Sequence, residues 1–377
     1  MPRLYPFLHR KYAIGLSLCI INQENRVMSA EYSVKYLSDN EYEQWDNFVA
    51  SSPDGSIYSM ASYLDVFCDV TSAKFKIMAV MKNEEIFGGV ALYERHSILG
   101  TFVSPRLFLY YNGLVLKDFE TSYPSKRTGR QIEVMSLLEE HLSRMKYARL
   151  SLNNRSTIRD ARPFIKQGWT VDLNYTYVAP LTDMKLLWDR TEQNLRRLIN
   201  RCTKQDIQIS MDDDFESFFK LHLEIHQRKG VSLYLPHGQF KRYFEKLLSR
   251  GLCQLYFARL SGGQPVAAQL VLLGPHPVSH TVCAGADADY LKMGVNPFLR
   301  WKVFEDLSGR GFAGNDLTDA ALNPVTHFKS QLGADLEICL QFKKRDSFPF
   351  KVREKARIFR DRSRNRLAKT RYSRKRT

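Results

Sequence analysis

The chain has 377 residues, of which 44% are hydrophobic, 12% aromatic and 25% charged. This length exceeds one ordinary hydrophobic core, and the composition is typical of a packed protein, so two domains are predicted and disorder over most of the chain is excluded. The net charge of +16 lies at the ends: residues 343–377 hold 16 Lys and Arg against three acidic residues, whereas residues 31–342 are neutral, which argues against a nucleic-acid-binding body.

The first apolar segment, residues 12–21, follows Arg10 and Lys11 and is similar to a signal peptide. No small-residue cleavage site follows it closely, so we expect an upstream extension before a start at Met28. In the domain division, residues 1–30 are assigned to an N-terminal extension. No apolar run reaches the roughly 18 residues of a membrane span. The six cysteines form no Cys-x-x-Cys pair, which favours reduced thiols in a cytoplasmic protein and no metal site.

Two segments predict the same hairpin. Residues 76–93 read as a strand, a polar turn and a second strand, and residues 254–272 repeat this pattern with two glycines at the turn. The small pairs Gly88-Gly89 and Ala267-Ala268 are 179 positions apart. This spacing is the first indication of an internal duplication.

The segments after each hairpin also match. The first copy continues with a helix over 131–146 and a strand over 148–152, and the second with a helix over 297–310 and a strand over 312–317. Asn296 is the expected N-cap of the later helix. A short helix, a glycine and a final strand then follow in both copies, after Phe164 and after Phe328.

This repeated order predicts an α/β fold of the α+β type with a mixed sheet. We expect two tandem modules packed around a central cleft, with a boundary near residues 180–183. The expected division is an N-terminal extension at 1–30, a first module at 31–180, a second module at 181–342 and a basic C-terminal tail at 343–377.

A hairpin, a helix entered from a glycine-containing turn, a strand and a short helix resemble the GNAT acyltransferase fold. Two such modules in one chain resemble the Fem-type aminoacyltransferases and the related FemAB-like and BioF2-like acetyltransferases, which modify cell-envelope precursors. The segments that carry the resemblance are 45–49, 110–113, 194–201, 226–230, 294–301, 316–317, 328–329 and 333–334.

The resemblance implies that acyl-CoA is the donor, with its pyrophosphate at the N-terminus of the helix that begins near residue 297. Lys292, Gly294 and Asn296 stand at that loop, although Leu291 occupies a position where relatives carry a polar residue. The corresponding place in the first copy, residues 126–130, matches no better. Relatives also continue with glycines after the Asp316-Leu317 step, whereas this chain has Thr-Asp-Ala.

Acyl transfer to an amine requires a base and groups that stabilise the oxyanion. Asp287 and Asp316 end predicted strands beside the donor loop, and His327 lies next to the Phe-Lys pair, so these three are the catalytic candidates. Ordinary turn or capping roles are the alternative for each carboxylate, including that of Asp319.

Cations and aromatic residues are the candidates for substrate binding. The resemblance places substrate-facing cations on the helix over 191–204 and near residue 230, and a lysine beside Phe328. Each charge has the alternative of a solvated surface position, and the aromatic residues have the alternative of interface packing. The candidates are Arg196, Arg197, Arg201, Arg228, Lys329, Tyr110 and Tyr111.

The predicted function is transfer of an acyl group, acetyl in the first instance, from acyl-CoA to an amine of a cell-envelope glycan or peptidoglycan-type precursor. Two alternatives stay open: an aminoacyl-tRNA-dependent Fem-type aminoacyltransferase, and a non-enzymatic RNA- or ribosome-binding protein acting through the tail. The tail has the charge to bind an anionic membrane surface or tRNA. The expected location is the cytoplasm, with peripheral attachment at the inner face of the membrane through residues 343–377.

Overall fold

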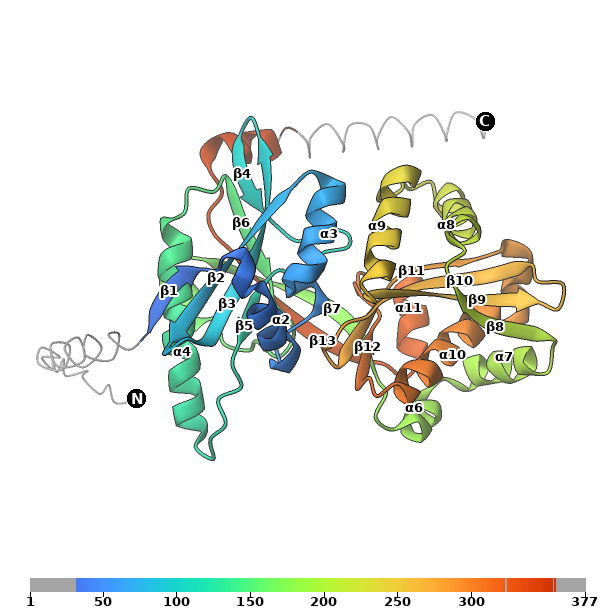
Figure 1. Ribbon diagram of the computed structural model, residues 1–377. Helices are drawn as coiled ribbons and strands as arrows, with labels where there is room; N and C mark the ends of the chain where they lie inside the picture. The colour runs from blue at the N-terminus through green and yellow to red at the C-terminus, as the bar shows by residue number, and fades with distance from the viewer. Residues whose placement is uncertain (1–31, 323, 355, 357–377) are drawn as a thin grey trace, which may run out of the picture.

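The computed structural model describes residues 32–322, 324–354 and 356. Their strands form a mixed α/β arrangement around one sheet with the order β1-β2-β3-β4-β6-β13-β7-β12-β11-β10-β9-β8, and β5 pairs with β3 (Figure 1). The predicted mixed-sheet fold is therefore confirmed. The predicted extension at 1–30 and the tail beyond 356 lie outside the described residues.

The first module supplies a hairpin whose two strands are packed by helices. Gly89 lies in β3, where an added Cβ would stand 2.6 Å from the carbonyl oxygen of Met78 and 2.7 Å from the Trp45 ring. A glycine here lets the buried Trp45 ring of α2 lie directly on the strand. The elements are β1 Ser33–Tyr36, α2 Tyr42–Ser51, α3 Ala61–Thr71, β2 Lys74–Lys82, β3 Glu85–Ser97, β4 Gly100–Val103, β5 Leu114–Leu116, α4 Pro124–Arg144, β6 Arg149–Asn153, α5 Arg162–Lys166 and β7 Thr170–Pro180.

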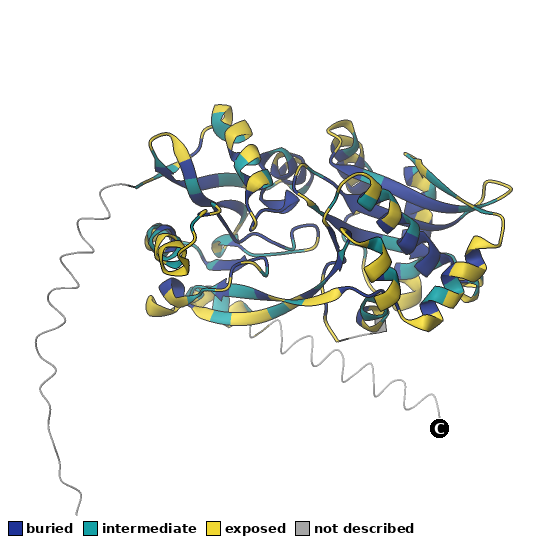
Figure 2. Ribbon diagram, turned by 90° about the horizontal axis from the view of Figure 1, so that it is seen from below, coloured by how far each residue is buried: buried dark blue, intermediate teal, exposed yellow. Residues whose placement is uncertain are grey.

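The second module repeats the order of hairpin, helix, strand, short helix and strand. Its elements are α6 Met184–Arg190, α7 Gln193–Thr203, β8 Ile207–Asp212, α8 Phe215–Lys229, α9 His237–Ser249, β9 Cys253–Leu260, β10 Pro265–Leu272, β11 Val278–Ala286, the 3-10 helix η3 Ala288–Met293, α10 Val295–Gly309, β12 Gly314–Asp316, α11 Pro324–Gln331 and β13 Asp335–Lys343. β9, β10 and β11 are mostly buried, whereas β8 and β13 are largely intermediate or exposed, and Figure 2 shows both kinds of strand beside helices with exposed faces.

The last strands of the two modules are exchanged. β7, from the first half of the sequence, pairs with β12 through Pro180↔Gly314 to Val178↔Asp316. β13, from the second half, pairs with β6 and runs antiparallel to β7 from Asp335↔Val178 to Lys343↔Thr170. Each half therefore completes its sheet with a strand from the other, and the spatial halves do not coincide with the proposed sequence division at residue 180.

An aromatic core joins the halves beside this exchange. Tyr63 of α3 and Tyr243 of α9 share a hydrogen bond with their hydroxyl oxygens 2.9 Å apart, and both side chains are buried. The Phe108 ring lies 5.2 Å from Tyr243 and 5.4 Å from Phe240. This core cluster takes residues from both halves, and two further clusters lie mainly in the second and in the first half.

Two predicted helix starts are wrong. α4 begins at Pro124, so Gly129 lies inside the helix and the first copy has no turn there. α10 begins at Val295 with Gly294 as its N-cap, and Asn296 is its second residue rather than its cap. Gly294 has φ +94°, and an added Cβ would lie 2.9 Å from Leu198 Cβ, so both the turn and the approach of α7 require glycine.

The first part of the predicted basic tail is packed against the first module. Residues 348–354 are helical, and the Phe350 ring lies 4.4 Å from the Arg149 guanidinium. Arg149 also forms an ion pair with Asp346 at 2.8 Å, and the Ser347 N–H donates to the Ala148 carbonyl at 2.9 Å. This basic segment is held here because Asp346 and the Phe350 ring both contact Arg149.

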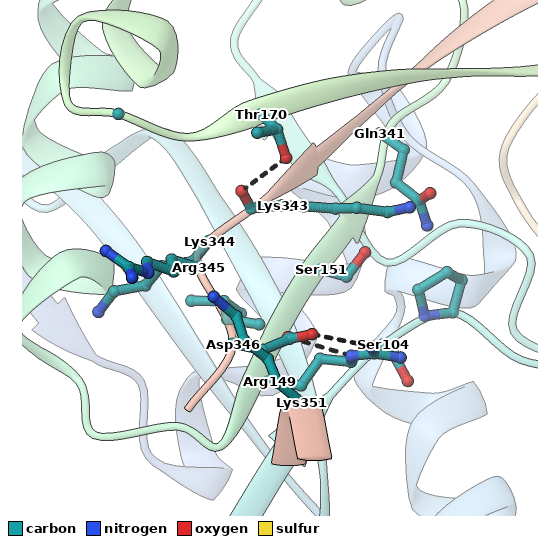
Figure 3. Close-up of a pocket in the computed structure, with 13 residues that line it drawn as sticks. Ser104, Arg149, Ser151, Thr170, Gln341, Lys343, Lys344, Arg345, Asp346 and Lys351 are labelled. Carbon is teal, nitrogen blue, oxygen red and sulfur yellow. Dashed lines mark hydrogen bonds and ion pairs between the residues drawn. The ribbon is translucent and has the colours of Figure 1, made fainter. Parts of the chain in front are cut away.

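This packed segment borders a basic cavity of about 550 Å³, which we call the tail cavity (Figure 3). Its charged lining is Arg149, Lys343, Lys344, Arg345, Asp346 and Lys351. Five cations surround one carboxylate, so the wall carries a net positive charge. Across the described residues, no helix combines the length and the hydropathy needed to span a membrane.

Candidate acyl-transfer site

The candidate site lies where two neighbouring parallel strands separate. β11 and β12 pair only from Val278↔Gly314 to His280↔Asp316. Beyond these pairs a cavity of about 550 Å³ lies between the strand continuations, and we call it the β11–β12 cavity. Its lining is Tyr110, Lys229, Tyr234, Thr281, Val282, Cys283, Ala284, Arg300, Leu317, Thr318, Asp319, Val325, Thr326 and Lys329.

A second cavity of about 460 Å³ adjoins the first and is called the β7 cavity, because Leu173 to Thr176 of that strand form one wall. Tyr110 and Asp319 line both cavities. Asp319 is also the only carboxylate among the described residues that line either one. Two spaces that meet at a tyrosine and a carboxylate suit two substrates that approach from opposite sides.

The turn that carries Asp319 has an unusual backbone. Thr318 and Asp319 have φ angles of +52° and +44°, in the left-handed region that glycine normally occupies. The Thr318 N–H donates to Asp316 Oδ1 at 2.7 Å, and its hydroxyl donates to the Thr281 carbonyl at 3.3 Å. Side-chain contacts thus hold a turn in a conformation that glycine adopts most easily.

Lys329 of α11 holds the same turn from the other side. Its ammonium donates to the Thr318 carbonyl and, at 2.7 Å, to the Asp319 carbonyl. Burial and, to a smaller extent, the nearby Arg300 charge lower the pKa of Lys329 to about 8. An ammonium has three N–H donors, so one more remains for a group in the β11–β12 cavity.

Asp316 lies under the cavity walls and does not line either space. It is 0% exposed, and it accepts hydrogen bonds from the Tyr111 hydroxyl and the Thr176 hydroxyl, each at 2.6 Å. Tyr111 and Thr176 do line the β7 cavity. The predicted catalytic position of Asp316 is therefore corrected: its carboxylate fixes the walls and the Thr318 turn.

His280 stands beside Asp316 but does not pair with its charge. The Nδ1 to Oδ2 distance is 3.6 Å, and within the described structure neither ring nitrogen has a hydrogen-bond partner. Complete burial lowers the pKa of His280 to about 4, so the ring is neutral at pH 7. Asp316 consequently relies on hydroxyl and amide donors rather than on an ion pair.

The structure does not bring the predicted site residues together. Lys329, Tyr110 and Tyr111 lie at the two cavities. Arg197, Arg228, Lys292 and His327 are exposed, while Arg196, Asp287 and Asn296 are partly buried; with Arg201, Gly294 and Asp316, none of them is among the lining residues of the two cavities. Of Arg196, Arg201, Arg228, Asp287, Asp316 and Lys329, only Lys329 lines either of these two cavities.

Several of these residues form a separate group at the start of α10. Arg201 of α7 donates to the Lys292 carbonyl, and Asp287 accepts from the Asp289 N–H at 3.0 Å as the cap of η3. The first helical N–H groups have no partner within a helix, and here Val295 and Asn296 carry them because Pro297 has none. This arrangement fits an anion such as a pyrophosphate.

Sequence reasoning missed Asp319 and Arg300. Asp319 was assigned a turn role, which is also true, but the separation of β11 from β12 places its side chain in both cavities. Arg300 lies between apolar residues of α10, although an arginine in a helix is usually a surface residue. The signal that could have found it is its neighbours, since Phe298, Leu299 and Trp301 are apolar on both sides.

Across the residues that the structure describes, no group of three or more His, Cys, Asp or Glu side chains is placed to hold a metal ion.

Comparison with known proteins gives the class. Residues 189–330 match the family model described as an acetyltransferase (GNAT) domain. A solved FemX structure has the same fold, with a TM-score of 0.64, 12% identity, and coverage of 82% of this chain and 96% of that one. A tandem GNAT protein from the clavulanic acid biosynthesis pathway is also similar, with a TM-score of 0.50, 10% identity, and coverage of 84% and 99%.

A third solved structure, L-PGS from Bacillus licheniformis, has a TM-score of 0.50 at 10% identity and covers 82% of this chain and 94% of its own. No curated protein sequence matches the chain. The chain thus contains a match to a GNAT acetyltransferase domain and has the fold of the FemX and tandem GNAT structures. The second module carries the acetyltransferase domain match.

Proposed function

We propose that the chain transfers an acyl group, acetyl in the first instance, from acyl-CoA to an amine of a cell-envelope glycan or peptidoglycan-type precursor. The observation that carries this proposal is the joint lining of two cavities by one carboxylate, Asp319, beside the Lys329 ammonium. The GNAT domain match over 189–330 supports acyl transfer. The acceptor class rests on the similarity to FemX.

The donor fits the residues at α10. The N–H groups of Val295 and Asn296, together with Arg201 and Lys292, would hold its pyrophosphate. The acyl end would then lie in the β11–β12 cavity, since α10 also supplies Arg300 to that space, five residues and about 7.5 Å farther along the helix than Val295. Bound acyl-CoA supplies the activated acyl group.

Different residues of the site accept the proton of the amine and stabilise the negative charge on the carbonyl oxygen. Asp319, reached from both cavities, takes a proton from the acceptor amine as it attacks. The remaining N–H of Lys329 faces the developing negative charge on the carbonyl oxygen. Tyr110, shared by the two cavities, forms the wall along which donor and acceptor meet.

The direct test is titration of the full-length chain with CoA, followed by thiol-release assays with acetyl-CoA and a panel of amino sugars, nucleotide-linked amino sugars and peptidoglycan-type peptides. Amine-dependent release of CoA is expected. Absence of CoA binding together with amine-dependent deacylation of charged tRNA would replace acyl-CoA by aminoacyl-tRNA as the donor. This alternative is kept because of the likeness to FemX and L-PGS.

The Lys329 ammonium predicts an alkaline limit to activity. Since the pKa of Lys329 is lowered to about 8, kcat/KM should fall by about tenfold per pH unit above pH 8. Lys329→Arg should remove this fall, because arginine stays protonated. Lys302→Met, at an ion pair with Glu305 on α10, is the control and should keep it. A wild-type profile that is flat to pH 10 would contradict the role of Lys329.

The same group gives a stability signature. The folded pKa lies below the ordinary value of 10.5. Between pH 8 and 10.5 the unfolded chain therefore holds a proton that the folded chain has lost, and the free energy of unfolding should rise with pH in this window. Lys329→Met should flatten the rise in denaturant titrations at pH 8 and pH 10.

The basic C-terminal end is proposed to hold the enzyme at an anionic membrane surface. The tail cavity adds a positive wall to the charge of residues 343–377. Removal of residues 357–377, which leaves the Phe350 and Asp346 contacts with Arg149 intact, should weaken binding to phosphatidylglycerol vesicles by about tenfold or more at low salt. Raising the ionic strength should have the same effect on the full-length chain.

Co-sedimentation with phosphatidylglycerol vesicles, phosphatidylcholine vesicles and tRNA measures this. Undiminished vesicle binding by the shortened chain would contradict anchoring by the tail. A clear preference for tRNA over anionic vesicles would favour the aminoacyl-tRNA donor or the RNA-binding alternative.

A further inference from the structure

Arg300 carries a buried charge that no described residue balances. The side chain lies on α10 and is 7% exposed. Its Nε and Nη1 atoms have no hydrogen-bond partner among the described residues, and it forms no ion pair with any of them. Burial alone lowers its pKa to about 10, so the guanidinium remains charged at pH 7.

The surroundings of Arg300 add positive charge. Lys329 and Lys229 line the same β11–β12 cavity. Asp319 is the one carboxylate among the lining residues described, and it lies at the edge shared with the β7 cavity. The rest of the lining is mostly apolar or aromatic, including Val282 and Leu317. The cavity therefore combines apolar walls with an excess of cations.

A buried guanidinium without a partner is costly, because it loses its hydration and gains no hydrogen bonds in return. Packing of its carbon stem does not offset this loss, since methionine or leucine would pack as well at that position. The cost is offset only when an anion enters the cavity. The planar guanidinium then presents paired N–H donors to two oxygens of one carboxylate or phosphate.

We propose that Arg300 binds an anionic group, a carboxylate or a phosphate, carried by one of the two substrates in the β11–β12 cavity. This inference rests on the proposed function for the identity of the substrates, but the binding itself does not depend on it. At about 550 Å³ the cavity is larger than a small anion, which leaves space for the group that the anion orients. Arg300 thus becomes a specificity-determining residue that selects an acidic substrate over its neutral analogue.

The first experiment measures the melting temperature of the full-length chain with and without phosphate and succinate, and with uncharged succinamide as the matched control. In the wild type, phosphate or succinate should raise the melting temperature, whereas succinamide should not. Arg300→Met and Arg300→Gln should lose this rise. Arg144→Met, at an exposed ion pair with Glu140 on α4, should keep it.

A readout without any anion separates a binding role from a structural one. If Arg300 serves to bind an anion, Arg300→Met without anion should melt at the same temperature as the wild type or higher, because the substitution removes an unpaired buried charge. A structural role predicts a lower melting temperature. The proposal is overturned if the wild type shows no anion-dependent rise, or if the folded neutral variants retain that rise.

The second experiment assigns the anion to donor or acceptor. Carboxymethyl-CoA and carbamoylmethyl-CoA are stable thioethers that differ in one carboxylate. If the wild type binds carboxymethyl-CoA about tenfold more tightly than carbamoylmethyl-CoA, and Arg300→Met binds the two equally, the anion belongs to the donor. Equal binding in the wild type places it on the acceptor. If neither derivative binds while the anion-dependent melting shift persists, the CoA-dependent function fails and the Arg300 site stands.

Discussion

Asp319→Asn is expected to lower kcat by about 10²- to 10⁴-fold with little change in stability, because the amide cannot accept the amine proton. Asparagine matches the shape of aspartate and tolerates the left-handed conformation that Asp319 adopts at φ +44°. Its side-chain oxygen can still accept from the Ala321 N–H, as Asp319 does at 3.2 Å. The turn should therefore survive the change.

The measurement is kcat from thiol release beside thermal melting of the same sample. Asp289→Asn is the matched control: Asp289 is exposed in the first turn of η3 and should keep full activity. An Asp319→Asn enzyme with unchanged kcat would show that the amine loses its proton elsewhere. Equal losses of melting temperature and kcat would point to a turn role alone.

Asp316→Asn is expected to destabilise the fold by about 2–4 kcal/mol, which is the opposite of what its position at a strand end suggested. The carboxylate accepts from Tyr111, Thr176 and the Thr318 N–H, all within 2.7 Å. A carboxamide has only one acceptor oxygen. Its NH2 group, which is itself a donor, would replace the second carboxylate oxygen and face a donor there. At least one buried donor then loses its partner.

Denaturant unfolding of Asp316→Asn and of Asp335→Asn measures this effect. Asp335 pairs with Arg190 at an exposed position, so its substitution should cost about 1 kcal/mol or less. Tyr111→Phe should recover part of the Asp316→Asn loss in the double variant, because it removes a donor that the carboxamide leaves unmatched. A stable but inactive Asp316→Asn protein would restore Asp316 as the base.

The order of elements was predictable from the sequence because hydrophobic period and turn residues are local. The hairpins at 76–93 and 254–272 and the order of the segments after them gave the duplicated layout. The exchange of β7 and β13 was not predictable, since an alternating apolar pattern predicts a strand but does not identify its neighbour. The observed helix starts, Pro124 and Val295, also differ from the predicted ones. Ahead of Val295, tertiary contacts between Gly294 and α7 override the local capping signal.

The strand-end argument named Asp287 and Asp316, and neither lines the two cavities. Lys329, named beside Phe328, and the aromatic candidates Tyr110 and Tyr111 do line them. Charged helices misled the interpretation: Arg197 and Arg228 are exposed, as charges on amphipathic helices usually are. Arg300 was missed although its apolar neighbours indicated burial, because the sequence does not show which cavity a buried arginine lines.

The exchanged final strands have a consequence for how the protein is made. During synthesis β6 and β7 leave the ribosome long before β13, which is their shared neighbour at residues 335–343. The edges of β6 and β7 stay unpaired until nearly the whole chain has been translated, because β12 is also synthesised late. Pairing over such sequence separations closes slowly and leaves those edges available to other chains. Nascent copies of this protein therefore depend on chaperones more than the size of either module alone would suggest.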